Sequence, residues 1–247
     1  EKEPFTYAKV INGKYAIAQR NGYFGTLTHA ESIGLNFEYE AIEPLPSETH
    51  QICKIRKGGV SGIATVAGKI LVIPQYEDIA NTTERIYMAR KLGKWGLVDA
   101  SGIWIASAVY DSITSPKLKD RLPDFPLVAW RKGKSQLIDS KGKIISEATR
   151  TNWIYLNEGM WTAHAEGKYK LVNGSGATQG ETLYDSIRTF SMSKAEACVG
   201  GKWGYINYYG KMVIPATFEA VLPFHNGVSF ARSQNNGAVC DPMGRRW

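Results

Sequence analysis

The chain has 247 residues, of which 43% are hydrophobic and 21% charged, and its formal net charge at pH 7 is +7. This composition is ordinary for a globular protein and provides for a substantial core. No stretch approaches the ~18 consecutive apolar residues of a membrane-spanning helix, and no low-complexity block or run of like charges predicts a disordered tail. The positive charge favours acidic partners, whether protein, glycan or nucleic acid, and does not choose among them.

Short strands separated by turns are predicted throughout the chain. The clearest set comprises the runs 86–91, 95–99, 103–107 and 109–113, which are rich in β-branched and aromatic residues and are bounded by Gly and Asp. Gly93 lies in the first intervening turn, where glycine adopts a positive φ at little cost. No segment longer than two helical turns is amphipathic with a 3.6-residue period, so the sequence predicts an all-β fold.

This four-strand unit is repeated. The heptapeptides GKWGLVD (93–99) and GKWGYIN (201–207) are nearly identical, and five more segments align with them less closely. The aligned positions are Phe24, Ser61, Trp95, Ser135, Tyr169, Trp203 and Asn236. They define seven units of about 35 residues, which together occupy the chain.

A second block, with an aromatic residue, an acid and a β-branched residue, recurs at the end of most units. Its copies are Tyr39–Ile42, Tyr76–Ile79, Tyr110–Ile113, Tyr184–Ile187 and Phe218–Val221. The fourth unit fits least well, with Trp153 and Ile154 near that place. Because acids that recur with the repeat are far more often turn or ion-pair residues than catalysts, we interpret this block as structural.

Seven units of four short antiparallel strands are typical of a closed seven-bladed β-propeller, and an open β-solenoid is the alternative. The last unit ends in its third strand, whereas residues 7–10 match the fourth-strand block. We therefore expect the N-terminal strand to complete the last blade, so that the ring closes and no sheet edge stays unpaired. Residues 1–247 would then form a single domain.

The segments GKWGLVDASG (93–102) and GKWGYINYYGKMVIPATFEAV (201–221) resemble the bacterial WG (KWG-type) repeat. The full signature stands in two units, and the other five keep its framework without the Trp or the Gly. The resemblance implies a β-rich bacterial protein and carries no functional residue with it. We expect Trp95 and Trp203 to fill the space between neighbouring sheets, and the glycine after each to allow a close backbone approach.

The sequence contains no familiar signature of catalysis or of metal binding. None of the four histidines lies in a metal-binding motif, and GVSGI (59–63) is a repeat copy and not a nucleophile motif. Cys53, Cys198 and Cys240 lie in apolar runs and are expected to be buried core residues. We therefore expect neither a cofactor nor an enzyme. An enzyme with carboxylates in a central channel would have to rely on non-periodic acids such as Asp120, Asp124 or Glu158.

Functional residues are expected where the repeat is interrupted. The longest insertion, 114–126, contains Lys117, Lys119 and Arg121 and is either a stiff solvated loop or a partner-binding loop. Tyr155, Trp161, Tyr208, Tyr209 and His225 belong to a second, aromatic and polar set, which loop packing would also explain. Basic residues at the first turn of each unit form a third set, and they could pair with the recurring acids or dock an acidic partner.

The sequence favours a non-enzymatic bacterial protein–protein interaction module whose partner has an acidic surface. An immunity or inhibitor protein is a specific version of this hypothesis. The alternative is a propeller that binds carbohydrate or the cell surface. Nucleic acid is not favoured as a partner, because no stacking platform of interleaved aromatic residues is evident. We expect export to the periplasm or cell surface rather than retention in the cytoplasm.

Overall fold

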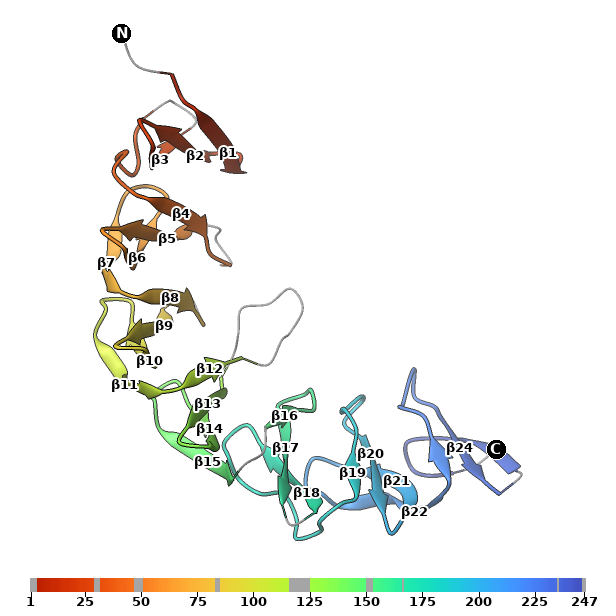
Figure 1. The fold of residues 1–247 in the computed structure, drawn as a ribbon. Coiled ribbons are helices and arrows are strands. Elements are labelled where there is room, and N and C mark those ends of the chain that lie inside the picture. Colours follow the sequence, from red (N-terminus) through yellow and green to blue (C-terminus); the bar gives the residue numbers. More distant parts are fainter. Residues whose placement is uncertain are drawn as a thin grey trace. The chain divides into compact units, whose positions relative to one another are not determined.

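The computed structural model describes residues 4–28, 32–46, 51–82, 85–115, 125–149, 153–165, 167–234 and 236–245. Within these residues the chain is all-β and forms seven small antiparallel sheets of three or four strands (Figure 1). In this described part, no helix has the length and apolar character needed to cross a membrane. The predicted all-β fold with seven repeated units is therefore confirmed.

The sheets are numbered in chain order. Sheet 1 contains β1 (Tyr7–Asn12), β2 (Tyr15–Arg20) and β3 (Tyr23–Thr28). Sheet 2 contains β4 (Ala41–Pro44), β5 (Ile52–Lys57), β6 (Val60–Thr65) and β7 (Ile70–Tyr76). Sheet 3 contains β8 (Asp78–Asn81), β9 (Ile86–Lys91), β10 (Lys94–Asp99) and β11 (Trp104–Tyr110). Sheet 4 contains β12 (Ser112–Thr114), β13 (Leu127–Arg131), β14 (Lys134–Ile138) and β15 (Ile144–Thr149). Sheet 5 contains β16 (Ile154–Tyr155), β17 (Met160–Ala165) and β18 (Lys168–Asn173). Sheet 6 contains β19 (Ser186–Ile187), β20 (Ala195–Val199), β21 (Lys202–Ile206) and β22 (Met212–Phe218). Sheet 7 contains β23 (Ala220–Val221), β24 (Ser229–Ser233) and β25 (Asn236–Cys240).

The chain divides into two compact units. Unit 1 comprises residues 1–131 and 140–143, and unit 2 comprises residues 132–139 and 144–247. Sheets 1 to 3 lie in unit 1 and sheets 5 to 7 in unit 2, and the division falls within the strands of sheet 4. The assignment of residues 1–247 to a single domain stays a prediction.

The structure corrects the place of the last strand of each predicted unit. The strand that follows the aromatic–acid block does not join the sheet of its own unit, but opens the next sheet: β12 pairs with β13, and β23 pairs with β24. β1 behaves in the same way and pairs with β2. The expectation that β1 completes the last sheet is therefore wrong. A closed propeller and an open solenoid both stay predictions for how the sheets are assembled.

The pairing register also corrects the last repeat. Ser233 pairs with Asn236 as Val199 pairs with Lys202, so Gly237 and not Asn236 occupies the position of Trp203. A Cβ atom at Gly237 would lie 2.4 Å from the ring of Phe230. An aromatic ring from the neighbouring strand thus fills the space beside this glycine.

The glycine that follows the Trp position is required by a close backbone contact. A Cβ atom at Gly62, Gly96 or Gly204 would lie 2.4 to 2.5 Å from a carbonyl oxygen of the next strand of the same sheet. That strand bulges at this point, because its register with the glycine-bearing strand shifts. The predicted close approach is therefore confirmed, and its partner is the fourth strand of the sheet.

The cores lie between successive sheets. In unit 1, one cluster unites residues of sheets 1 and 2, including Ile17, Leu35 and Ile55, and another unites sheets 2 and 3 around Tyr76 and Tyr87. In unit 2, one cluster joins sheets 5 and 6 and another joins sheets 6 and 7. Because each cluster needs two sheets to form, a single repeat could not bury its apolar face alone.

Trp203 is half-buried and packs against the cluster between sheets 6 and 7, as the sequence predicts. The three cysteines are buried and free, which confirms their interpretation as core residues. Burial raises the pKa of the Cys53 thiol to about 12, so this thiol is not activated for chemistry at neutral pH.

The turn between the third and fourth strands of a sheet, here called the capped turn, follows one design. In sheet 6, Asn207 Oδ1 accepts hydrogen bonds from the backbone N–H groups of Tyr209 and Lys211 at 3.0 and 3.1 Å. Asp99, Asn173 and Asp241 cap the equivalent turns in the same way. These side chains hold the turn, as Asn and Asp commonly do.

Each capped turn also touches the preceding sheet. Tyr76 Oη donates to the Gly102 carbonyl at 2.9 Å, and Tyr184 Oη donates to the Gly210 carbonyl at 2.6 Å. Gly102 and Gly210 have φ values of 79° and 69°, and a Cβ atom at Gly210 would lie 2.4 Å from the carbonyl oxygen of Gln179. The aromatic residue of one repeat and the glycine of the next therefore fit together as a pair.

Candidate partner-binding surface

Several basic residues at the turns between second and third strands form ion pairs with the recurring acids. Glu40 accepts from the Gly59 N–H at 3.2 Å and lies 3.6 Å from Arg56 Nε, and Glu77 repeats both contacts with Gly93 and Arg90. Further ion pairs are Lys94–Asp111, Lys168–Asp185 and Lys202–Glu219. The hydrogen bonds from Lys168 and the Gly201 N–H hold the pKa of Asp185 below its ordinary value. These acids thus tie turns together, in agreement with their structural interpretation.

A different edge of unit 2 gathers the residues that interrupt the repeat. The turns between first and second strands of sheets 5, 6 and 7, here called opening turns, comprise residues 156–160, 190–194 and 224–228. Their backbones use left-handed conformations, with φ of 67° at Asn157, 64° at Ser193 and 49° at Asn226. The chain therefore reverses tightly at each of them.

Hydrogen bonds join the opening turns to one another and to the capped turn of sheet 6. Glu158 Oε2 accepts from Tyr208 Oη at 2.6 Å and from the Ser193 N–H at 3.1 Å. Tyr208 also stacks on Phe190, with 5.2 Å between ring centroids. Burial and the bond to Glu158 raise the pKa of the Tyr208 hydroxyl. Glu158 therefore connects sheets 5 and 6.

Sheets 6 and 7 are connected at the same edge. Ser191 Oγ donates to the Phe224 carbonyl at 2.8 Å, and the Gly227 N–H donates to Met192 Sδ at 3.3 Å. Lys194 Nζ lies 5.6 Å from the centroid of the Phe224 ring. The three opening turns and the capped turn of sheet 6 thus form one row, here called the turn surface.

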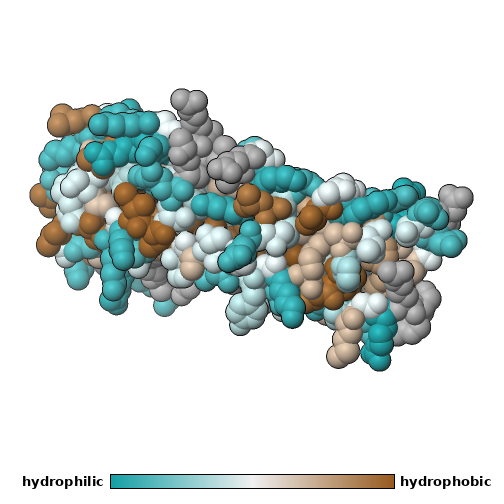
Figure 2. Space-filling view, turned by 90° about the horizontal axis from the view of Figure 1, so that it is seen from below, coloured by the Kyte–Doolittle hydropathy of each residue, from teal (hydrophilic) through white to brown (hydrophobic). Residues whose placement is uncertain are grey.

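The turn surface exposes apolar and aromatic side chains. Tyr209 is 75% exposed, Met192 47% and Val228 42%, and His225 is exposed as well. Exposed apolar side chains also occur elsewhere, and Figure 2 shows them as separate patches among hydrophilic residues on one face. On the turn surface, these side chains stand on turns held by side-chain hydrogen bonds, which reduces the entropy lost on binding.

Some of the predicted site residues lie together on the turn surface, and others lie elsewhere. Tyr208, Tyr209 and His225 lie on the turn surface. Trp161 does not, because its side chain is only 1% exposed, and its indole packs against Tyr155 with 5.0 Å between ring centroids. Trp161 is thus a core residue, and its assignment to a binding surface is wrong. Tyr155 is half-buried and its hydroxyl accepts from the Gly159 N–H at 3.2 Å, so it supports an opening turn.

Most residues of the insertion 114–126 lie outside the residues that the structure describes. Lys117, Lys119 and Arg121, together with Asp120 and Asp124, fall in the undescribed range 116–124. Their assignment as a partner-binding loop stays a prediction. Among the described residues, no three His, Cys, Asp or Glu side chains gather as a metal site would require.

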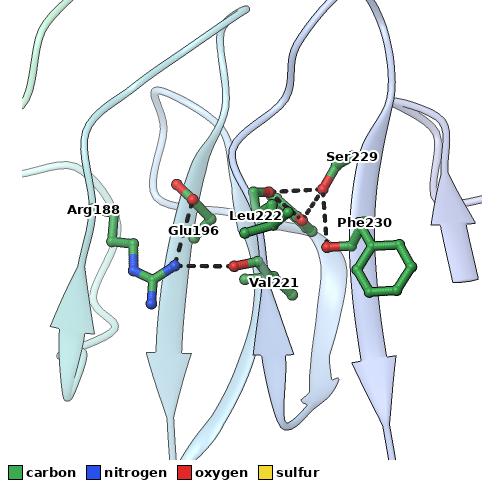
Figure 3. A network of polar contacts seen from close by, with 7 residues as sticks. Arg188, Glu196, Val221, Leu222, Ser229 and Phe230 are labelled. Atoms are coloured by element: carbon green, nitrogen blue, oxygen red, sulfur yellow. Dashed lines mark hydrogen bonds and ion pairs between the residues drawn. The ribbon is translucent and has the colours of Figure 1, made fainter. Parts of the chain in front are cut away.

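Sequence reasoning missed the strongest polar network of unit 2. Glu196 on β20 has a side chain 3% exposed and faces Arg188, whose Nη1 lies 3.7 Å from Glu196 Oε1 and donates to the Val221 carbonyl at 3.0 Å (Figure 3). Burial raises the pKa of the Glu196 carboxyl, and Arg188 opposes that rise. No local signal in the sequence reveals this pair, because its members are close only through the pairing of β19 with β20.

A hydroxyl cluster lies beside that pair. The hydroxyls of Tyr205 and Ser229 lie within hydrogen-bond distance of each other and of the Leu222 carbonyl oxygen, which is 2.8 Å from Tyr205 Oη and 2.7 Å from Ser229 Oγ. Burial raises the pKa of Tyr205 to about 12. The Arg188 guanidinium lies 4.2 Å from the centroid of the Trp203 ring. The network therefore joins sheets 6 and 7.

The chain is similar to known proteins in its structure and in the sequence of one repeat. Three solved structures are similar over most of the chain: one titled crystal structure of the eukaryotic initiation factor (TM-score 0.43, 9% identity, 98% of this chain and 74% of that chain), Kluyveromyces lactis Hsv2p (0.35, 7%, 97% and 93%) and the C-terminal WD40 domain of Sif2 (0.36, 9%, 95% and 80%). At these TM-scores the similarities carry no conclusion about this chain. No curated protein matches the sequence. The family model of the WG containing repeat matches residues 203–237, so this segment is a WG containing repeat, as the resemblance of the sequence indicated.

Proposed function

We propose that the chain is a non-enzymatic interaction module that docks a protein partner on the turn surface. The observation that carries this proposal is the row of hydrogen-bonded turns that exposes Tyr209 and Met192. Exposed tyrosine and methionine are enriched at the centres of protein interfaces, and short turns on a rigid sheet scaffold are common places for recognition.

The net charge of +7 supports a partner with an acidic surface. On the turn surface itself, Lys194 and His225 could face acidic groups, while Glu158 is occupied by its contacts to Tyr208 and Ser193. An immunity or inhibitor protein of a bacterium remains the specific version of the proposal. The loop 114–126 would add a second contact.

The experiment compares retention of partners by three forms of the full chain. The wild type, a Tyr209→Ala/Met192→Ala double variant and a Leu92→Asn control are used as bait in extracts of the source organism at low and high salt. Leu92 is 87% exposed in the turn between β9 and β10 and has a φ of 51°, a conformation that Asn tolerates well. The control therefore removes an exposed apolar side chain outside the turn surface.

We expect the wild type to retain one protein stoichiometrically, even at high salt. The double variant should retain at least about tenfold less of it, because central aromatic anchors carry much of the binding energy. The Leu92→Asn variant should retain it. Equal retention by all three baits would contradict docking on the turn surface.

A carbohydrate-binding role is a second candidate, because Tyr209 exposes an aromatic face beside polar groups. Retention of the bait on glycan fractions, with loss in the Tyr209 variant and no protein captured, would support this role instead.

A further inference from the structure

A cleft of about 390 Å³ lies between sheets 1 and 2 in unit 1. Tyr7, Ile17, Phe24, Ile42 and Pro44 form its apolar walls, Ala41 contributes a small side chain, and Lys9 and Glu43 are its charged residues. Its volume lies within the range of small-molecule sites, which are mostly apolar with a few polar groups. The cleft is separate from the turn surface of unit 2.

The register of the strands explains why a cleft forms here. Lys54 lies opposite Glu43 in sheet 2 and extends to Asp78 of sheet 3, with 2.7 Å between Lys54 Nζ and Asp78 Oδ1. At the equivalent positions one repeat earlier, Ile17 lies opposite Lys9, and Ala41 takes the place of Asp78. The long side chain and ion pair that bridge sheets 2 and 3 are therefore replaced by an isoleucine and an alanine, which leave space.

The two charged residues of the cleft differ in their partners. Glu43 has a counter-charge, because Lys54 Nζ lies 3.7 Å from its carboxylate. Lys9 is exposed, and within the described residues it has no ion pair. An unpaired ammonium beside aromatic walls favours an anion with an apolar body. The Tyr7 and Phe24 rings, 5.9 Å apart and nearly perpendicular, would present ring faces and edges to an aromatic group.

We propose that this cleft binds a small aromatic carboxylate, whose ring packs against the contacting pair of Tyr7 and Phe24 and whose carboxylate pairs with Lys9. 3-Phenylpropionate is the probe, since it joins a phenyl ring to a carboxylate through two methylene groups. Phenethylamine has the same body with a cationic end, so it tests whether Glu43 rather than Lys9 determines the charge of the ligand.

Binding is measured on the full ¹⁵N-labelled chain by NMR titration with each probe. We expect 3-phenylpropionate to shift the amide resonances of residues 7–11 and 41–43, with a dissociation constant on the order of millimolar for so small a ligand. Phenethylamine should bind more weakly. Equal or tighter binding of phenethylamine, or the absence of localised shifts with 3-phenylpropionate, would overturn the proposal.

Two variants and one control locate the site. Lys9→Met should weaken binding of 3-phenylpropionate by about 2- to 5-fold, the effect of one exposed ion pair, and Ala41→Leu should abolish binding by filling the cleft. Lys69→Met makes the same charge change at an exposed residue outside the cleft and should bind as the wild type does. If Ala41→Leu fails to fold, the comparison of Lys9→Met with Lys69→Met decides, and equal affinities of these two variants would refute the role of Lys9.

A peptide C-terminus that ends in an apolar residue presents the same chemistry as the free acid. N-Acetyl-alanyl-phenylalanine distinguishes the two sources. We expect it to bind no more tightly than 3-phenylpropionate; tighter binding, lost on Lys9→Met, would replace the free acid by a peptide terminus as the occupant.

Discussion

The Glu43–Lys54 pair of sheet 2 and the Arg188–Glu196 pair of sheet 6 occupy the same place in the repeat. In each sheet, one member stands on or just after the first strand and lies opposite the other on the second strand. The signs are exchanged: the first strand carries the acid in sheet 2 and the base in sheet 6. In both cases the basic member reaches the following sheet, to the Asp78 carboxylate or to the Val221 carbonyl.

The two places differ in burial and therefore in energy. The Asp78 and Glu43 side chains are 43% and 63% exposed, so water can solvate them if Lys54 is removed. The Glu196 side chain is 3% exposed and has no such access. The comparison teaches that this bridging position of the repeat can be filled by different chemistry, with different consequences for stability.

The largest loss of stability is expected at a feature that sheets 2 and 6 share, the glycine packed against the backbone of the fourth strand. Gly62→Ala and Gly204→Ala should each destabilise the chain by about 3 kcal/mol, because the added Cβ would meet a backbone carbonyl oxygen at 2.4 Å that cannot move without breaking the sheet. Urea unfolding followed by circular dichroism measures the change. Gly201→Ala is the control, since its Cβ would meet nothing within 4 Å and only its φ of 74° is unfavourable, which costs about 1 kcal/mol. Equal losses at Gly201 and Gly204 would show that backbone contact is not the cause.

The next largest loss of stability should differ between the two ion pairs. Arg188→Met should cost about 2 kcal/mol at neutral pH, because it leaves Glu196 buried without its counter-charge. Lys54→Met should cost less than about 1 kcal/mol, since the acids it leaves behind are exposed. The same unfolding measurement, made on both variants in one buffer, tests the difference. Similar losses for the two variants would contradict the contrast in burial.

The smallest effect is a difference in pH dependence. Burial raises the pKa of Glu196 above its ordinary value of 4.5, so the folded chain binds this proton more tightly than the unfolded chain does. Stability contributed by the protonated form is thus present at low pH and is lost as pH rises above 4.5 through the folded pKa. Glu196→Gln should lack this loss, and its stability relative to the wild type should increase from pH 4 to pH 7. Glu43→Gln removes an exposed carboxylate at the equivalent pair and serves as the control. A parallel course of wild-type and Glu196→Gln stability over this range would refute the prediction.

Much of the fold could be predicted from the sequence, because the signals are local. Glycine at turns and alternating apolar residues predict the strands, and the similar heptapeptides predict the repeat. The assignment of β1 and of the other first strands failed for a physical reason: these strands follow one sheet in the chain but form their hydrogen bonds with the next. The last repeat was misaligned by one residue because Gly237 stands at the Trp position and Phe230 supplies the ring.

The candidate site was predictable only in part. Tyr208, Tyr209 and His225 interrupt the repeat, and Tyr209 and His225 lie exposed on turns, while their role in binding a partner stays a prediction. Trp161 was misassigned because an aromatic residue next to a turn can point to either side of its strand, and pairing placed its ring in the core. The bond between Glu158 and Tyr208 joins residues 50 positions apart, and only the stacking of sheets 5 and 6 brings them together.

The glycines of the capped turns have a consequence for how such a chain can change in length. Gly68, Gly142, Gly176 and Gly210 each fit against the backbone of the sheet immediately before them, where a Cβ would lie within 2.9 Å of its atoms. Fitting depends on the neighbour alone and not on the position of a repeat in the series. Duplication or loss of one whole repeat would therefore preserve this fit at the remaining turns of this kind, whereas a shift of one residue within a repeat would place a side chain where only a hydrogen atom fits.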